Sequence, residues 1–330
     1  MEIQDWSRIF ADLAKLFLMT GLLVAPNAHL GLAAEPQAPS GGRPLALQTS
    51  VEMVLVPVTV TDNYGKTIEG LKAQNFTIFD DGVPQPIASF VSEDAPSSVG
   101  LVLDTSGSMR DSLGAAKEVI HVFLTSANTG DEFQLLTVSS QPEAVSGFTT
   151  DTAALENDVQ LTRPYGFTAL IDTVYLGLNK MRRGSQPRRA LVVLSDGMDN
   201  HSRYSKRELM RVAIEADVQV YSVIFDNDAS SATVPHRSAM IAKPWDHPQE
   251  SQGRELLEGL AEKTGGLHFR ARNGSERKEA ATKIGQAIRG QYLIGYQPPH
   301  SYQPGKWHRI RVKTGVPNVS VYARSGYYSR

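Results

Sequence analysis

The hydrophobic and polar positions of this chain change their period along its length. Valines occupy every second position from Val54 to Val60, which is the pattern of a half-buried strand. From Ser98 onward, apolar runs of strand length alternate with segments in which apolar residues recur every three or four positions. That alternation is typical of a parallel sheet with helices on both faces. The sequence therefore predicts an α/β domain with a mostly parallel sheet.

The elements expected in the central region can be given as residue ranges. Strands are expected at 100–103, 133–140, 190–195, 218–225 and 267–271, and helices at 113–127, 152–161, 171–181, 205–216, 255–266 and 278–288. Residues 226–254 show no clear periodicity and are expected to form a long loop, which would be either functional or disordered.

Two flanking segments complete the expected domain organisation. Residues 50–95 alternate like strands and contain the turn sequences DNYG and DDG, so they predict a small β-rich module. The α/β domain is expected at 97–290. Three short alternating runs in 291–330 predict a strand-forming tail that pairs with 50–95 into an accessory β-rich unit.

The amino terminus has the pattern of a signal peptide. The apolar run LFLMTGLLVA at 16–25 follows Lys15, and Pro26 interrupts it well before the ~20 apolar residues that a membrane span needs. We therefore expect a signal peptide at 1–34, a flexible linker at 35–49 that is rich in Pro, Gly and Ala, and export to the periplasm or the extracellular space. An uncleaved membrane anchor and a cytosolic amphipathic helix are the alternatives.

Composition excludes several classes of function. With 33 basic and 35 acidic residues the net charge is -2, so neither nucleic-acid binding nor strong membrane binding after cleavage is expected. The chain of 330 residues has no cysteine, which rules out disulfides, thiolate metal ligands and cysteine nucleophiles together.

Oxygen-bearing side chains gather where the expected strands end. Asp104, Ser106 and Ser108 follow the strand at 100–103, and three hard oxygen donors in that spacing suit a small divalent cation. Thr168 and Asp196 lie in two later loops that should reach the same edge, because ligands bind at the carboxyl ends of strands in open α/β sheets. The set contains neither histidine nor cysteine, so it favours Mg²⁺ first, with Mn²⁺ or Ca²⁺ possible, over Zn²⁺.

Helix capping is the simpler explanation for some of these residues. Asp104 and its serine neighbours could cap the helix that is expected to follow them, and Thr168 could cap the helix at 171–181. Capping does not require a second acid on a neighbouring strand, which favours the metal site. Asp199 and Asn200 are expected to shape their loop.

The motifs resemble those of von Willebrand factor type A (VWA) domains. DTSGSM at 104–109 matches the DxSxS signature of that family, GFTAL supplies the threonine, and LSDGMDN supplies the second aspartate. The resemblance covers about residues 97–290 and implies a doubly wound α/β fold with a metal-ion-dependent adhesion site. More loosely, the TVTDxxGxxIxGLxxxxFxIxDDG pattern at 59–82 resembles an exported segment of secreted bacterial VWA-related proteins.

The resemblance also implies roles for the five candidate residues. In the family pattern, Ser106, Ser108 and Thr168 coordinate the ion directly, whereas Asp104 and Asp196 act mainly through water. A cation so placed is under-neutralised and would accept an Asp or Glu of a protein partner as a further ligand. We therefore expect a non-enzymatic, metal-dependent adhesion or envelope-assembly module.

Two other functions remain open at this point. The first is a structural envelope scaffold in which the metal only stabilises the fold. The second is a metal-dependent hydrolase, although Ser106 stands where phosphatases with an aspartate nucleophile carry a second aspartate.

Overall fold

The computed structural model describes residues 53–92, 94–225, 248–299 and 303–329. The expected signal peptide at 1–34, the linker at 35–49 and residues 226–247 of the expected loop lie outside these described residues. None of the described helices is both long enough and apolar enough to cross a membrane.

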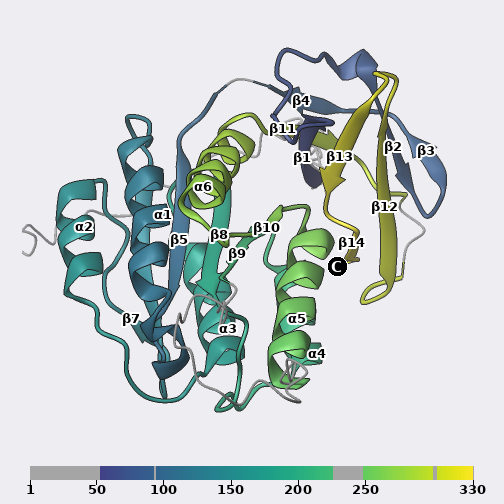
Figure 1. Cartoon of the computed structure of the whole chain (residues 1–330). Coiled ribbons are helices and arrows are strands. Elements are labelled where there is room, and N and C mark those ends of the chain that lie inside the picture. Colours follow the sequence, from purple (N-terminus) through teal and green to yellow (C-terminus); the bar gives the residue numbers. More distant parts are fainter. Residues whose placement is uncertain (1–52, 93, 226–247, 300–302, 330) are drawn as a thin grey trace, which may run out of the picture. The chain divides into compact units, whose positions relative to one another are not determined.

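A six-stranded sheet forms the centre of the α/β domain, with the strand order β10-β9-β8-β5-β6-β7 (Figure 1). Its strands are β5 (Ser97–Asp104), β6 (Glu132–Val138), β7 (Glu143–Ala144), β8 (Arg188–Ser195), β9 (Gln219–Ile224) and β10 (His268–Arg270). All neighbouring strands pair in parallel except the short edge strand β7, which is antiparallel to β6. The mostly parallel sheet predicted from the sequence is confirmed.

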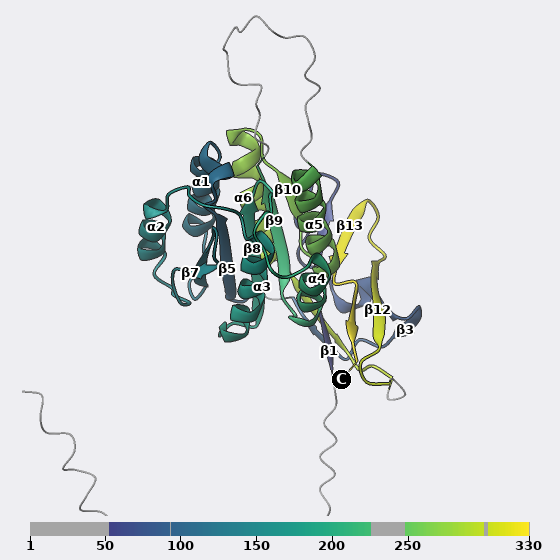
Figure 2. The same cartoon turned by 90° about the horizontal axis from the view of Figure 1, so that it is seen from below.

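Helices cover both faces of this sheet, as Figure 2 shows. They are α1 (Leu113–Thr125), α2 (Thr152–Leu161), α3 (Leu170–Lys180), α4 (Lys206–Glu215), α5 (Pro248–Thr264) and α6 (Gly274–Arg289). The short 3-10 turns η2 (Gly107–Arg110) and η3 (Met181–Arg183) belong to the same domain, whereas η1 (Ala73–Asn75) lies in the accessory β-rich unit. Side chains of α1 and α6 pack on one face, and those of α3, α4 and α5 pack on the other.

Helix α5 begins at Pro248, so the expectation of a loop through 254 was wrong. Its first turns are polar, and the apolar period begins only at Leu256.

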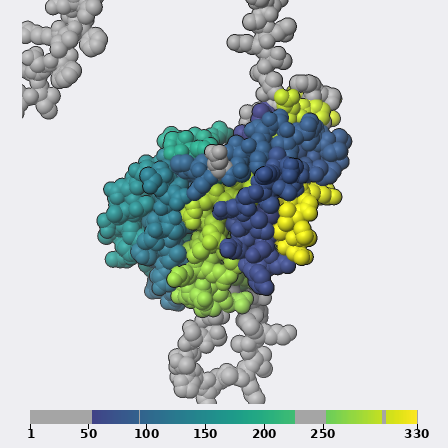
Figure 3. All heavy atoms as spheres, turned by 90° about the horizontal axis from the view of Figure 1, so that it is seen from above, coloured from purple at the N-terminus to yellow at the C-terminus, as the bar shows by residue number. Residues whose placement is uncertain are grey.

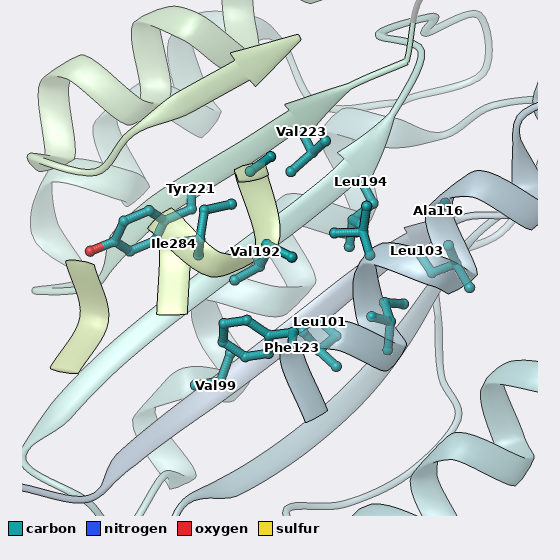
Figure 4. Close-up of a cluster of buried hydrophobic side chains, with 14 of the residues drawn as sticks. Val99, Leu101, Leu103, Ala116, Phe123, Val192, Leu194, Tyr221, Val223 and Ile284 are labelled. Atoms are coloured by element: carbon teal, nitrogen blue, oxygen red, sulfur yellow. The ribbon is translucent and has the colours of Figure 1, made fainter. Parts of the chain in front are cut away.

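Alternate residues of β5 supply the cores of the two faces. Leu101 and Leu103 belong to the cluster that contains Phe123 of α1 and Ile284 of α6 (Figure 4). Val102 points to the opposite face and joins the cluster with α3, α4 and α5. Every residue of β5 is buried, because both faces of a parallel sheet are covered.

The accessory β-rich unit consists of two four-stranded sheets, ordered β13-β1-β11-β4 and β14-β12-β2-β3. Its strands are β1 (Val54–Asp62), β2 (Phe76–Asp80), β3 (Val83–Gln85), β4 (Ser89–Val91), β11 (Tyr292–Tyr296), β12 (Trp307–Thr314), β13 (Val319–Ala323) and β14 (Gly326–Tyr328). Strands that precede the α/β domain pair antiparallel with strands that follow it.

The last alternating run forms two strands rather than one. Strand β13 pairs with β1, whereas β14 pairs with β12 in the other sheet. Between them the Ser325 N–H donates to the carbonyl of Lys263 in α5, at 2.9 Å. This hydrogen bond to the α/β domain lies where the chain passes from one accessory sheet to the other. The alternation of residues within the run does not predict that change of sheet.

Polar contacts join the accessory unit to the α/β domain. The Lys283 ammonium of α6 donates to the carbonyl of Tyr64 at 2.6 Å. Figure 3 shows the dark-blue atoms from the start of the described chain lying against a yellow-green segment from later in the chain. The buried guanidinium of Arg188, at the start of β8, donates to the carbonyls of Arg289 at 2.6 Å and Gln291 at 3.1 Å. One buried side chain thus ties β8 to the end of α6 and the start of β11.

Candidate metal centre

The candidate site lies where β5 and β8 end. These strands are direct neighbours, with Leu103 opposite Leu194, so Asp104 at the end of β5 and Asp196 just after β8 reach the same edge. Both aspartates are buried, with 0% and 1% of their surface exposed. Two carboxylates are therefore held in a region from which water is largely excluded.

Both carboxylate oxygens of Asp104 accept hydrogen bonds from the protein. Its Oδ1 accepts the Ser106 N–H at 3.0 Å, and its Oδ2 accepts the Ser195 hydroxyl at 2.5 Å. Burial, together with the nearby charge of Asp196, nevertheless raises the pKa of Asp104 to about 7. The negative charge of this pair is thus costly unless a cation or a proton compensates it.

Ser106 and Ser108 place their hydroxyl groups side by side, with the Oγ atoms 3.0 Å apart. Ser106 precedes the turn η2 but makes no side-chain capping bond there. Helix α1 has Ser112 as its N-cap residue, so none of the three predicted residues of this loop caps it. Helix capping therefore does not explain why these oxygen donors gather here.

The loop that carries Thr168 is bound to the Asp104 loop through its backbone. The Gly107 N–H donates to the carbonyl of Gly166 at 3.1 Å, and the Tyr165 N–H donates to the carbonyl of Thr105 at 2.8 Å. Gly166 has a φ of 77°, and a Cβ there would lie 2.6 Å from Ser140 Oγ, so a side chain would be strained and crowded.

Thr168 itself is buried, with 2% of its surface exposed, and it is not the capping residue of α3. Its N–H donates to Asn200 Oδ1 at 2.9 Å, and its carbonyl accepts the N–H groups of Asn200 and His201 at 3.0 Å each. Asp199 Oδ1 instead accepts the Leu170 N–H in the first turn of α3, at 2.9 Å. Asp199 and Asn200 therefore shape the loop and position Thr168.

The structure thus brings the predicted residues to one edge of the sheet in two ways. Asp104, Ser106, Ser108 and Asp196 are linked by side-chain or electrostatic interactions. The loop that carries Thr168 is joined by backbone hydrogen bonds to the loops that follow β5 and β8. Sequence reasoning missed Ser195, whose hydroxyl binds Asp104 Oδ2. Its position as the last residue of a buried strand, next to Asp196, was the available signal. Buried carboxylates with adjacent hydroxyl groups fit a hard divalent cation.

Aromatic side chains lie exposed beside this site. Phe167, next to Thr168, is 60% exposed and stacks on His201 with ring centroids 5.2 Å apart. Tyr165 in the same loop is 56% exposed. The two loops that position Thr168 therefore also present an aromatic surface, which we call the aromatic rim (Tyr165, Phe167 and His201).

Together these features define a doubly wound α/β domain with an oxygen-donor site at the carboxyl edge of its sheet. Residues 99–198 match the family model of the von Willebrand factor type A domain. The matched segment runs from β5 to the loop after β8 and contains all five predicted site residues. The VWA resemblance inferred from the motifs is confirmed for this segment.

The solved structures to which this chain is similar include three from bacteria. An aerotolerance-related membrane protein from Bacteroides fragilis is 18% identical, with a TM-score of 0.45, and the match covers 58% of this chain and 98% of that one. A von Willebrand factor type A protein from Catenulispora acidiphila is 12% identical, with a TM-score of 0.47, 86% of this chain and 75% of the other being covered. The vWF domain of a type V pili tip protein from Porphyromonas gingivalis is 14% identical, with a TM-score of 0.43 and coverage of 59% and 95%. No curated protein matched the sequence.

Proposed function

We propose that this chain is a non-enzymatic, metal-dependent protein-binding module, which engages an Asp or Glu of a partner protein through a divalent cation. Asp104, Ser106, Ser108, Thr168 and Asp196 would hold the ion, with Mg²⁺ first among the candidates. When bound, the ion supplies a Lewis-acidic position that an external carboxylate can occupy.

The observation that carries the proposal is the bonding of Asp104. Both of its oxygens already accept hydrogen bonds, from the Ser106 N–H and the Ser195 hydroxyl. This arrangement favours a role for Asp104 through water and leaves the neutral hydroxyls of Ser106 and Ser108 as direct ligands. Neutral ligands leave the charge of a cation under-neutralised, which favours an anionic ligand from outside.

The aromatic rim supports a protein partner rather than a small anion. Exposed aromatic side chains are enriched in protein interfaces, where they bury large areas at a small cost in side-chain entropy. Phe167 and Tyr165 extend the contact area beyond a single carboxylate. Export of the chain, proposed from the apolar run at 16–25, would place this surface in the periplasm or outside the cell.

The test is binding of a library of peptides that each carry one Asp or Glu, with matched Asn and Gln peptides, measured in Mg²⁺ and in EDTA. We expect acidic peptides to bind only in Mg²⁺ and only to chains that retain Ser106. Ser106→Ala should abolish binding, whereas Ser275→Ala, an exposed serine in α6, should bind like the wild type.

Other outcomes would favour the other functions. If Mg²⁺ raises the melting temperature but no acidic peptide binds, the site is a structural one. Binding that persists in EDTA and in Ser106→Ala would contradict the proposal. A hydrolase would instead be supported if the chain turned over a generic phosphate ester, if Mg²⁺ stimulated that turnover, and if Asp104→Asn abolished it.

A further inference from the structure

A second group of metal-ligating side chains lies in the accessory β-rich unit. Asp80 ends β2, Asp81 begins the turn to β3, and His308 lies in β12, the strand that pairs with β2. Each residue offers a nitrogen or carboxylate oxygen, and these three atoms lie within 4.8 Å of one another. The two adjacent aspartates and His308 are more than two hundred positions apart in the chain.

Asp80 is fully buried and only partly satisfied. Its Oδ2 accepts the hydroxyls of Tyr296 and Tyr327, both at 2.9 Å. Its Oδ1 is also buried and has no hydrogen-bond partner among the described residues. A buried carboxylate oxygen without a donor is costly, and coordination of a cation would remove that cost.

Asp81 and His308 are already in contact. Asp81 Oδ2 lies 2.8 Å from His308 Nδ1, and Asp81 Oδ1 accepts the Arg309 N–H at 2.8 Å. The His308 side chain is 6% exposed and that of Asp81 is 45% exposed, so an ion can reach the group from the Asp81 side. In the ion pair that involves this group, His308 is the basic partner of Asp81.

We propose that Asp80, Asp81 and His308 form a second cation site, which takes a transition-metal ion of the zinc class. An imidazole nitrogen with two carboxylate oxygens suits Zn²⁺ and its neighbours better than Mg²⁺. The site differs in this respect from the all-oxygen set at the end of β5, so the two can be loaded separately.

The place of the site indicates what the ion does there. Its ligands lie on β2, its turn and β12, while the tyrosines bonded to Asp80 come from β14 and from β11 in the other sheet. An ion bound here joins the segment before the α/β domain to the segment after it. Metal binding by such a site stabilises the folded state, because the unfolded chain does not hold the ligands together.

The experiment titrates Zn²⁺ into tag-free protein in saturating Mg²⁺, which keeps the all-oxygen site filled, with calorimetry and the melting temperature as readouts. We expect one equivalent of Zn²⁺ to bind and to raise the melting temperature. Asp81→Asn should weaken binding roughly tenfold or more. This variant is expected to fold, because Asn tolerates the left-handed turn, φ 48°, and retains an acceptor for the Arg309 N–H.

Matched variants separate this site from the first. His308→Ala should lose the zinc equivalent, whereas His268→Ala, an exposed histidine on β10, should keep it. Asp104→Ala should also keep it, so failure of the proposed adhesion function would leave this result intact. The proposal is overturned if the wild type shows no saturable binding of one Zn²⁺ ion, or if Asp81→Asn binds Zn²⁺ with the affinity of the wild type.

Discussion

Replacing Asp104 with asparagine is expected to stabilise the metal-free protein near neutral pH, although it removes a proposed metal-site carboxylate. Burial, with the charge of Asp196, raises the pKa of Asp104 from 3.8 to about 7. The folded chain therefore keeps a proton that the unfolded chain releases as pH rises. The Asp104 carboxyl group therefore lowers the free energy of unfolding as pH rises from 3.8 to about 7, and the full loss of stability is present above about pH 7.

The size of the effect follows from that shift. A difference of about three pKa units corresponds to about 4 kcal/mol. At about pH 8 the free energy of unfolding of the wild type is lower by this amount than it would be with a neutral group at position 104. Asparagine has one acceptor oxygen instead of two, so either the Ser106 N–H or the Ser195 hydroxyl loses its bond, at a cost of about 1 kcal/mol. The net gain for Asp104→Asn in EDTA is about 3 kcal/mol at about pH 8. Below about pH 4 the pKa shift contributes nothing, so the lost hydrogen bond leaves the variant about 1 kcal/mol less stable than the wild type.

Urea unfolding at about pH 5 and about pH 8, in EDTA and in Mg²⁺, measures this effect. In EDTA the wild type should lose stability between the two pH values, and Asp104→Asn should lose much less. In Mg²⁺ the wild type should gain stability and the variant should not. Asp158→Asn on α2 is the control and should follow the wild type. The reasoning is refuted if Asp104→Asn is the less stable protein in EDTA at about pH 8, or if its pH dependence equals that of the wild type.

Two further substitutions test the supports around the site. Ser195→Ala removes the hydroxyl that binds Asp104 Oδ2, and Mg²⁺ affinity measured by calorimetry should fall about tenfold. Ser222→Ala, which removes another buried strand hydroxyl, should leave that affinity unchanged. Arg188→Met leaves the carbonyls at the end of α6 and the start of β11 without their charged donor, and urea unfolding should show a loss of about 3 kcal/mol. Exposed Arg183→Met should cost much less.

The fold could be predicted because its signals are local and strong. Buried parallel strands such as β5 and β8 are continuous apolar runs, and the polar residues that follow them mark the carboxyl edge of the sheet. The start of α5 was mispredicted because its first turns carry no apolar stripe. The split of the last run between β13 and β14 was missed because Ser325 makes its bond to a distant helix.

The candidate site was predictable only as a set of residue types at a common edge. Asp104 ends β5, Ser106 and Ser108 follow it, and Asp196 reaches the same edge because parallel strands align their ends. Thr168 instead lies between α2 and α3, in a loop that backbone hydrogen bonds join to the Asp104 loop. The sequence could not show that Asp104 shares a bond with Ser195, since the two residues are 91 positions apart. It also could not show which neighbours position Thr168.

The sequence by itself determined the alternation of the main strands and helices of the α/β domain, the edge of the sheet at which oxygen donors gather, and the kinds of ligand present. These follow from side-chain period and chemistry, which act over a few residues. Only the tertiary structure decided how Asp104 is bonded, how far burial shifts its pKa, and how Asp80 meets His308 across the accessory unit. Those properties depend on distances between residues far apart in the chain, and long-range packing sets them.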